Sequence, residues 1–311
     1  MHCDTVAFFI FNRPDTTRLV FERIAAARPR RLLVVADAAR AGRAGEDELC
    51  RQTRAVVERI DWPCDVERDY ALENMGCRRR LASGLDWVFG QVDDAIILED
   101  DCLPHPTFFR YCSDLLDRYR DDSRVMAISG DSFQPESRAA TGSYYFSRYF
   151  HCWGWATWGR AWATYDVGMS DWPQLARTRW LATRLHDDRG AMQFWEKTFT
   201  DVHEGRVDTW DCQFLYACWK AGGLTILPSR NLVSNIGFRA DATHTAASGS
   251  KWAALPVEAM QFPLVHRDVE QDRRADEWSQ HYLFEGRRRP SFMRSMSRWW
   301  RPREPVTRRS A

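Results

Sequence analysis

Short strand-like segments alternate with segments of helical spacing through the first 130 residues. The pattern predicts strands at residues 5–11, 31–36, 64–70, 95–98 and 125–129. Between them, apolar residues three or four positions apart predict a helix that begins at Pro14 and helices at 46–60, 77–89 and 108–119. This alternation is typical of a mostly parallel sheet with helices on both faces, so we expect an α/β fold.

Tryptophan dominates the pattern in the second half of the chain. Nine of the fifteen Trp residues fall between Trp153 and Trp219. The spacing predicts four short helices, at 155–165, 172–186, 191–204 and 209–221, and a strand at 224–227. Residues 228–251 have little apolar content and several small residues. Because a loop of that length is usually functional or mobile, we expect a mobile loop there.

Composition and charge divide the chain into a body and a tail. The 311 residues are 44% hydrophobic, which is enough for a folded core. Nine Arg and one acidic residue between Arg287 and Arg309 give an excess of eight positive charges, and the remainder carries about −7 because the whole chain carries +1. A mildly acidic body argues against nucleic acid as a partner. We expect one domain over 3–265 and a basic tail over 266–311.

The tail has two interpretations. Trp299 and Trp300 lie among its arginines, and such a segment can contact an anionic membrane surface; a solvated terminus is the alternative. No apolar run approaches the ~18–20 residues of a membrane span, and the N-terminus does not resemble a signal peptide. Nine scattered Cys without a Cys-x-x-Cys pair suit a reducing compartment. We expect a cytoplasmic protein, either free or peripheral at the inner membrane face.

Three adjacent carboxylates, Glu99-Asp100-Asp101, follow the predicted strand at 95–98. In open α/β sheets, ligands bind beyond the carboxyl ends of the strands. The same edge receives the residues that follow the first two predicted strands, Asn12, Arg13 and Asp37. Adjacent carboxylates repel one another unless a cation offsets them, and oxygen ligands suit Mn²⁺ or Mg²⁺. The sequence therefore indicates either a divalent metal site or a solvated acidic turn.

Polar and aromatic residues of the second half are further candidates. Asp208 is placed to cap a helix with Asp211 at its third position, and Asp211 there is also suited to act as a general base. His244 is either an exposed loop residue or an additional metal ligand. Trp153 and Trp155 lie in a segment too dense in aromatics for an exposed helix, so each is either core or a platform for a sugar ring.

The order of these motifs resembles nucleotide-sugar glycosyltransferases of the GT-A fold. The motifs are Asn12-Arg13-Pro14, Asp37, Glu99-Asp100-Asp101 and the segment 153–158. The Glu-Asp-Asp form resembles the N-acetylglucosaminyltransferase I family, and segments 97–104 and 153–158 resemble related bacterial sugar transferases. The resemblance covers roughly residues 6–245. It implies a Rossmann-like, mixed and mostly parallel sheet, with a nucleotide-sugar-binding half over 3–130 and an acceptor half over 131–265.

The resemblance also implies a role for each candidate residue around a UDP-sugar. Asn12 and Arg13 would border the nucleotide and its phosphates, Asp37 would accept the uracil N3–H, Arg78 would reach the diphosphate, and Glu99 and Asp100 would contact ribose or metal-bound water. Asp101 would hold Mn²⁺ (or Mg²⁺), with His244 as a further ligand. Asp211 would be the base of an inverting transfer. Trp153, Trp155 and Asp208 would border the acceptor.

These observations predict a metal-dependent glycosyltransferase. It would move a hexosyl or N-acetylhexosaminyl group from a UDP-sugar to a glycan or lipid-linked acceptor in bacterial surface glycan synthesis. A sugar-1-phosphate nucleotidyltransferase is one alternative, but it normally needs a Gly-rich basic loop where this chain has Asn12-Arg13-Pro14-Asp15. A non-catalytic glycan-binding protein is another, since it would explain the Trp cluster without the acidic motif.

Overall fold

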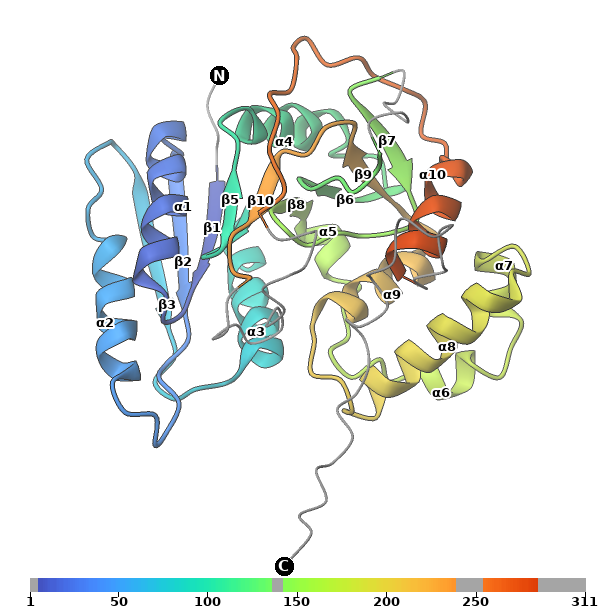
Figure 1. Ribbon diagram of the computed structural model, residues 1–311, viewed down its shortest axis with the longest axis horizontal. Coiled ribbons are helices and arrows are strands. Elements are labelled where there is room, and N and C mark those ends of the chain that lie inside the picture. The colour runs from blue at the N-terminus through green and yellow to red at the C-terminus, as the bar shows by residue number, and fades with distance from the viewer. Residues whose placement is uncertain (1–4, 136–141, 239–253, 285–311) are drawn as a thin grey trace, which may run out of the picture.

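An eight-stranded, mostly parallel sheet forms the centre of the protein (Figure 1). The computed structural model describes residues 5–135, 142–238 and 254–284. The strands follow the order β3-β2-β1-β4-β8-β6-β9-β7, with the respective bounds Asp65–Tyr70, Arg31–Ala36, Thr5–Ile10, Asp94–Glu99, Trp155–Trp158, Val125–Ser129, Leu224–Pro228 and Tyr144–Ser147. β8 and β7 run antiparallel to their neighbours, whereas the other pairs are parallel. The predicted α/β fold class is confirmed.

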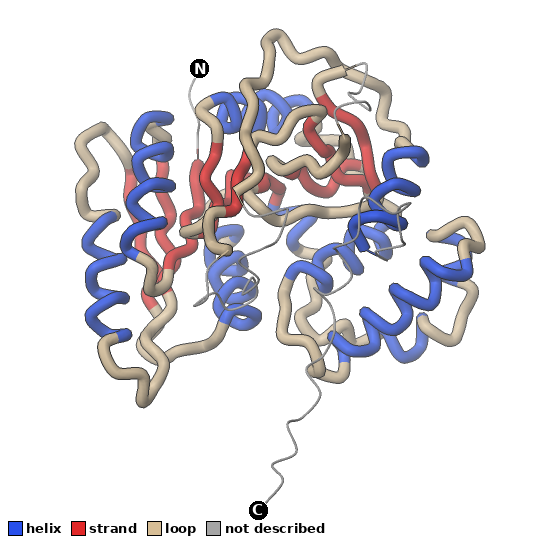
Figure 2. Tube along the Cα trace, viewed as in Figure 1, coloured by secondary structure: helices blue, strands red, loops and turns tan. Residues whose placement is uncertain are grey.

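Helices cover both faces of this sheet, as Figure 2 shows. One face carries α1 (Pro14–Ala27), α2 (Glu46–Val56) and α4 (Thr107–Arg118), and the other carries α3 (Cys77–Phe89) with helices of the second half. Side chains alternate along β1, so that Phe8 belongs to the core beneath α1 and Phe9 to the core beneath α3. The apolar runs of the first half are therefore buried on both sides.

Short helices build the second half. They are α5 (Gly159–Trp162), α6 (Trp172–Leu175), α7 (Trp180–Arg184), α8 (Arg189–His203) and α9 (Asp211–Ala221). The helix predicted at 172–186 is divided into α6 and α7. Most of the tryptophans in this half are core, since Trp172, Trp195 and Trp219 are each 2% exposed.

The segment 155–165, predicted as a helix, begins instead as a strand. β8 lies between β4 and β6 and pairs antiparallel with both. All four of its residues are buried. A central strand is covered on both faces, so its side chains need no polar alternation, and closely spaced aromatics there carry no helical period. Only α5, which follows β8, is helical.

A second, two-stranded sheet joins the acidic motif to a distant part of the chain. It pairs β5 (Cys102–Pro104) with β10 (Val233–Asn235) in antiparallel register. The segment 228–251, predicted as a loop, therefore contains a strand. Val233 of this strand is buried in the main core. Beyond β10, the Ile236 N–H donates to the Asp101 carbonyl oxygen at 2.8 Å. Residues 239–253, which include most of the predicted mobile loop, lie outside the described residues.

The described residues beyond 265 pack onto the body. A helix and a π-helical turn end the described structure, α10 (Arg273–Trp278) and η2 (Ser279–Phe284). Asp276 is 1% exposed and accepts hydrogen bonds from the Ser147 hydroxyl and the Arg148 N–H. The domain therefore extends to at least residue 284 instead of ending at the predicted boundary. The Arg-rich part of the predicted tail lies outside the described residues.

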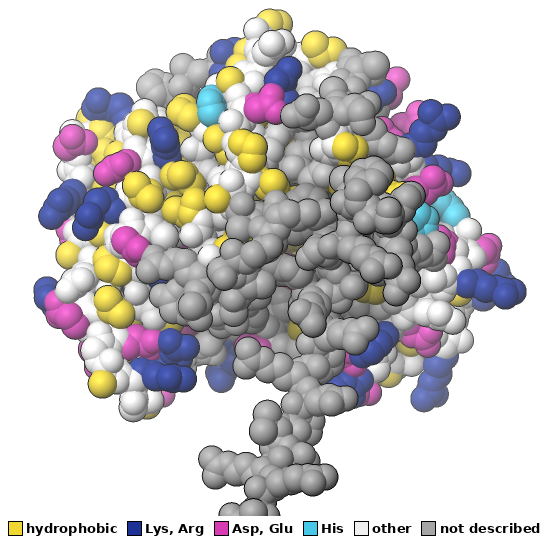
Figure 3. All heavy atoms as spheres, viewed as in Figure 1, with side chains coloured by type: hydrophobic (Ala, Val, Ile, Leu, Met, Phe, Trp, Pro, Cys, Tyr) yellow, Lys and Arg dark blue, Asp and Glu magenta, His cyan; other side chains and the backbone are white. Residues whose placement is uncertain are grey.

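None of the described helices has the length and apolar content that crossing a membrane requires. On the face seen in Figure 3, acidic and basic side chains are mixed over the described part of the surface. Such mixing fits a body of small net charge.

Candidate functional site

One cavity opens at the carboxyl ends of β1, β2 and β4, the edge at which ligands of such sheets bind. Its volume is about 340 Å³. It brings together most of the sequence-predicted site residues, namely Arg13, Asp37, Glu99, Asp100, Asp101, Trp153, Asp208 and Asp211. Convergence of titratable groups from separate segments on one concave surface makes this cavity the candidate active site.

The three carboxylates at the end of β4 have strongly perturbed environments. Asp100 is 7% exposed and its Oδ2 accepts a hydrogen bond from the Phe11 N–H at 3.0 Å. Burial raises the pKa of Asp100 to about 7. Burial, together with the Asp101 and Asp100 carboxylates, raises the pKa of Glu99 well above its usual range. These carboxylates repel one another in a poorly solvated place, so an added cation would relieve the repulsion.

Arg13 is the basic partner of this motif. Its Nη1 lies 2.7 Å from Asp101 Oδ2 and 3.5 Å from Asp100 Oδ1. The residue precedes Pro14, the first residue of α1, and its side chain is 18% exposed where it lines the cavity. A guanidinium in this place can bind phosphate oxygens as well as carboxylates.

Gly237 lies directly against the Asp101 carboxylate. A Cβ added at Gly237 would overlap Asp101 Oδ2. The adjacent Ile236 holds the Asp101 backbone, so the segment after β10 fixes both the main chain and the side chain of this residue. In the sequence, only the presence of a glycine at position 237 could have indicated this contact.

Asp211 lies at the start of α9, but not at the position that the capping pattern predicted. It is the first residue of the helix, and Trp210 occupies the N-cap position. Asp208 is exposed and does not cap the helix. The predicted capping arrangement is therefore wrong, because α9 begins three residues later than Asp208.

The two oxygens of Asp211 have different surroundings. Oδ1 accepts hydrogen bonds from the Thr209 hydroxyl and, at 2.9 Å, from the Cys212 N–H. Among the described residues, Oδ2 is approached by the Cys152 thiol at 3.9 Å, which is a weak contact. One oxygen is thus held in place while the other remains available, an arrangement suited to a general base.

The Asp37 carboxylate is fully engaged within the protein. The side chain is 6% exposed. Its Oδ1 accepts from the N–H groups of Ala38 and Met75, both at 2.9 Å. Its Oδ2 accepts from the Asn74 amide and the Gly76 N–H, both at 3.0 Å. A carboxylate offers about four acceptor sites, so none is left for the uracil N3–H, and Asp37 instead organises the loop between β3 and α3.

Glu46 and Arg40, which the sequence did not single out, shape the same end of the cavity. Glu46 is 5% exposed and accepts hydrogen bonds from Asn12 Nδ2 at 3.0 Å and the Arg40 N–H at 2.7 Å. The Arg40 guanidinium also pairs with Glu46 and lines the cavity. Asn12 does not line it. Asn12 therefore holds Glu46 and the loop before α2, and the expected place of Asn12 at the edge of the cavity is wrong.

Two further predicted site residues, Arg78 and Trp155, do not line the cavity, and a third lies outside the described residues. Arg78 does not line the cavity, and its guanidinium donates to the Val167 carbonyl oxygen at 2.7 Å. Trp155 is fully buried on β8 and stacks on Trp210 with ring centroids 5.5 Å apart. Its predicted contact with an acceptor is therefore wrong, because the core encloses the ring. His244 lies outside the described residues.

Trp153 is the tryptophan of the 153–158 segment that reaches the cavity. Its ring makes edge-to-face contacts with Phe133 and Phe238, with centroids 5.2 and 5.5 Å apart. These neighbours fix the indole at the cavity wall. An aromatic ring in such a place can pack on the C–H face of a sugar.

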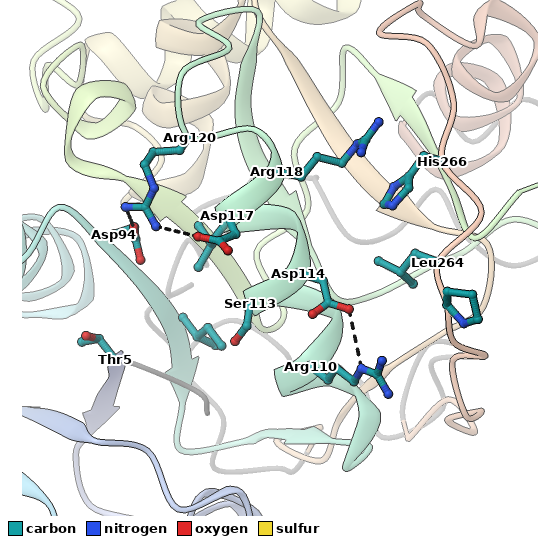
Figure 4. A pocket seen from close by; sticks show the side chains of 13 residues that line it. Thr5, Asp94, Arg110, Ser113, Asp114, Asp117, Arg118, Arg120, Leu264 and His266 are labelled. Atoms are coloured by element: carbon teal, nitrogen blue, oxygen red, sulfur yellow. Dashed lines mark hydrogen bonds and ion pairs between the residues drawn. The ribbon is translucent and has the colours of Figure 1, made fainter. Parts of the chain in front are cut away.

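A larger cavity, of about 610 Å³, lies along α4 and away from these residues (Figure 4). Five of its charged side chains form ion pairs with one another, Arg120 with Asp94 and Asp117, and Arg110 with Asp114. Asp94 is the first residue of β4, so this cavity faces the amino ends of the strands. Ligand sites of parallel sheets lie at the opposite edge.

The acidic motif fits a metal that is shared with a bound ligand. Within the described residues, no three His, Cys, Asp or Glu side chains are grouped so as to hold a metal by themselves. Mg²⁺ is usually bound by one or two carboxylates together with substrate phosphates, and not by an all-protein cage. Asp101, with the repulsion that its neighbours create, matches that arrangement.

Comparison with solved structures finds likenesses at low sequence identity, of which three are given below. No protein family matches the sequence, and no curated protein matches it. A mannosyltransferase from Pyrobaculum calidifontis, in complex with GDP-Man and Mn²⁺, is 16% identical over 68% of this chain and 73% of its own, with a TM-score of 0.35. A 4-diphosphocytidyl-2C-methyl-D-erythritol synthase from Anaerococcus prevotii is 9% identical over 52% and 75%, with a TM-score of 0.33. An apo UDP-glucose pyrophosphorylase is 9% identical over 72% and 90%, with a TM-score of 0.34. Likenesses of this size fix no function.

Proposed function

We propose that this protein is a metal-dependent glycosyltransferase that moves a sugar from a UDP-sugar to an acceptor hydroxyl. The observation that carries the proposal is the convergence of Glu99-Asp100-Asp101, Asp211 and Arg13 on one cavity at the carboxyl edge of the sheet. Glycosyl transfer needs groups that offset the charge of a diphosphate and a carboxylate that accepts a proton. The cavity has both.

In this proposal the donor lies along the cavity. The nucleoside occupies the end lined by Asp37, Asn74 and Arg40, and the diphosphate lies at Arg13 and Asp101. Asp101 would hold Mn²⁺ or Mg²⁺, and the bound ion would act as a Lewis acid on the diphosphate leaving group. Arg13 would bind a phosphate oxygen through its guanidinium.

Asp211 is the proposed general base. Its Oδ2 takes the proton of the acceptor hydroxyl while the hydroxyl oxygen forms a bond to the anomeric carbon. The bond from that carbon to the diphosphate oxygen breaks, and its electron pair leaves with UDP. Attack opposite the leaving group inverts the anomeric centre. Thr209 and Cys212 hold Oδ1, so they orient the carboxylate.

The acceptor side of the cavity is bordered by Trp153 and Asp208. We assign it to a glycan or lipid-linked acceptor of bacterial surface glycan synthesis, because an aromatic ring beside a carboxylate suits a sugar with free hydroxyls. The arginines between 287 and 309 would hold the enzyme at an anionic membrane surface close to such an acceptor. The proposal places the enzyme in the cytoplasm, at the inner face of the membrane.

The test is calorimetric titration of UDP with and without Mn²⁺, combined with turnover of UDP-sugars. Asp101→Ala should abolish Mn²⁺-dependent UDP binding. Asp211→Asn should keep UDP binding and lower turnover by roughly 10²–10⁴-fold. Asp114→Ala, which removes a carboxylate on α4, should change neither.

Two results would contradict the proposal. One is an affinity for UDP that neither Mn²⁺ nor the Asp101→Ala substitution changes. The other is pyrophosphate release from UTP and a sugar 1-phosphate, which would favour the nucleotidyltransferase alternative.

A further inference from the structure

We infer that Asn74, and not Asp37, presents the hydrogen-bond acceptor that contacts the uracil ring of the donor. The inference deepens the proposed function and rests on it, since it takes a uridine diphosphate to be bound with its base at the Asp37 end of the cavity. It starts from the Asp37 carboxylate, whose acceptor sites are filled by four donors of the protein itself.

The Asn74 amide is held in one orientation. Its Nδ2 donates to Asp37 Oδ2 at 3.0 Å and to the Ala38 carbonyl oxygen at 2.7 Å. An amide nitrogen carries two hydrogens, so both are committed and the positions of nitrogen and oxygen are set. Asn74 Oδ1 accepts no hydrogen bond from the described residues. Because Asn74 is partly exposed and lines the cavity, this oxygen is an acceptor available to a ligand.

Arg40 supplies a donor to the same cavity. Its Nε and Nη2 are committed to Glu46, and Nη1 makes no hydrogen bond to the described residues. The side chain is 43% exposed and lines the cavity, with Cζ 5.6 Å from the centre of the Phe11 ring. Asn74 donates a hydrogen bond to the carbonyl oxygen of Ala38, two positions before Arg40. This hydrogen bond joins the loop that carries the acceptor to the loop that carries the donor.

This pair of groups complements the pairing edge of uracil. That edge has a single donor, N3–H, between two carbonyl oxygens. The Asn74 amide oxygen can accept the N3–H, and the Arg40 guanidinium can donate to a neighbouring carbonyl. Asp37 then acts behind Asn74 as a positioning residue, because it fixes the amide without touching the base. Asn74 is the specificity-determining contact.

A cycle that modifies both ligand and protein tests the inference. Dissociation constants for UDP and N3-methyl-UDP would be measured in the presence of Mn²⁺. The proteins are the full-length wild type and its Asn74→Ala and Leu72→Ala variants. In the wild type, methylation should weaken binding about tenfold, because it removes the N3–H donor. In Asn74→Ala, UDP should bind about tenfold more weakly and methylation should have no further effect. Leu72, which is 98% exposed on the same loop, is the matched control and should behave as wild type.

The ratio of the two dissociation constants decides the outcome, since it does not depend on the fraction of folded protein. If Asn74→Ala weakens both nucleotides equally and keeps the wild-type ratio, Asn74 only shapes the loop and the inference is overturned. Equal binding of both nucleotides by the wild type overturns it as well. If the wild type binds no UDP with or without Mn²⁺, the proposed donor is wrong and the inference falls with it.

Discussion

Arg13 Nη1 lies 2.7 Å from Asp101 Oδ2, so the carboxylate that we propose as the metal ligand also accepts a hydrogen bond from a cation of the protein. The same guanidinium lies 3.5 Å from Asp100 Oδ1. A divalent metal and Arg13 are both attracted to this pair of carboxylates and repel each other. Under the proposed function, Arg13 would link metal binding to phosphate binding, because a phosphate would give its guanidinium a second partner.

Arg13→Met should tighten the binding of Mn²⁺ in the absence of UDP and weaken the binding of UDP. Without UDP, removal of a positive charge beside Asp101 should tighten Mn²⁺ binding by roughly tenfold. With UDP, loss of the phosphate contact should weaken nucleotide binding by a similar factor. Paramagnetic resonance of free Mn²⁺ measures the first effect and calorimetry the second. Arg110→Met, on α4, is the control, and an unchanged Mn²⁺ affinity without UDP would show that Arg13 does not compete.

Gly237→Ala tests the contact between the segment after β10 and the acidic motif. The added methyl would overlap Asp101 Oδ2 and displace the carboxylate. We expect Mn²⁺-dependent UDP binding to weaken by roughly tenfold or more, with the variant still folded. Gly168→Ala is a fair comparison, because its Cβ would meet only the Asp166 side chain at 3.4 Å. Wild-type UDP affinity in Gly237→Ala would mean that the Asp101 position is not critical.

Trp155 and Trp153 should differ in what their removal affects. Trp155 is fully enclosed, so Trp155→Ala should lower the free energy of unfolding by about 3–5 kcal/mol. Trp153 lines the cavity, and Trp153→Ala should cost about 1 kcal/mol or less, with its main effect on turnover. Urea denaturation of both variants provides the comparison. Equal losses of stability would contradict the assignment of one ring to the core and the other to the site.

The buried pair His151 and Asp131 predicts a pH dependence of stability. His151 Nδ1 lies 3.7 Å from Asp131 Oδ2, and burial lowers the pKa of His151 to about 4. The unfolded chain therefore binds more protons between about pH 4 and 6.5, so the contribution of His151 to stability is complete above that range and is lost as the pH falls through it. Burial raises the pKa of Asp131, which has the opposite effect.

Urea denaturation of His151→Gln across this pH range tests the prediction. The stability advantage of the wild type over the variant should shrink on acidification from pH 7 to 4.5, by up to about 3 kcal/mol. Asp131→Asn should make the loss of stability on acidification steeper, because the opposing group is gone. A stability difference that does not vary with pH would contradict the assignment.

The first half of the fold could be predicted because its local pattern and its tertiary structure agree. β1 and β2 are apolar after their first residue, and α1 starts at Pro14 as expected. The second half could not be predicted in the same way. β8 contains Trp155 and Trp158, and it is buried by neighbours from distant parts of the chain, so the local spacing of its aromatics indicates neither helix nor strand.

The candidate site could be predicted where it depends on strand ends and charge. Asp101 and Arg13 follow strands and meet at one cavity. The state of Asp37 could not be foreseen, because three of its four donors are backbone N–H groups that any residue types would provide. Asn74 and Arg40 were also missed. Each gains its orientation from a partner that only the folded loops bring close.

β8 lies between β4 and β6, so the sheet of the first half is completed only after part of the second half has been synthesised. β4 and β6 emerge from the ribosome first, but the strand that joins them ends at Trp158. Until then both carry unpaired backbone groups along apolar strands, and such edges readily pair with other chains. A fragment that ends at residue 130 should therefore aggregate when expressed alone. The first half of the fold is thus not a self-contained unit, and transferring it to another protein would require transferring β8 as well.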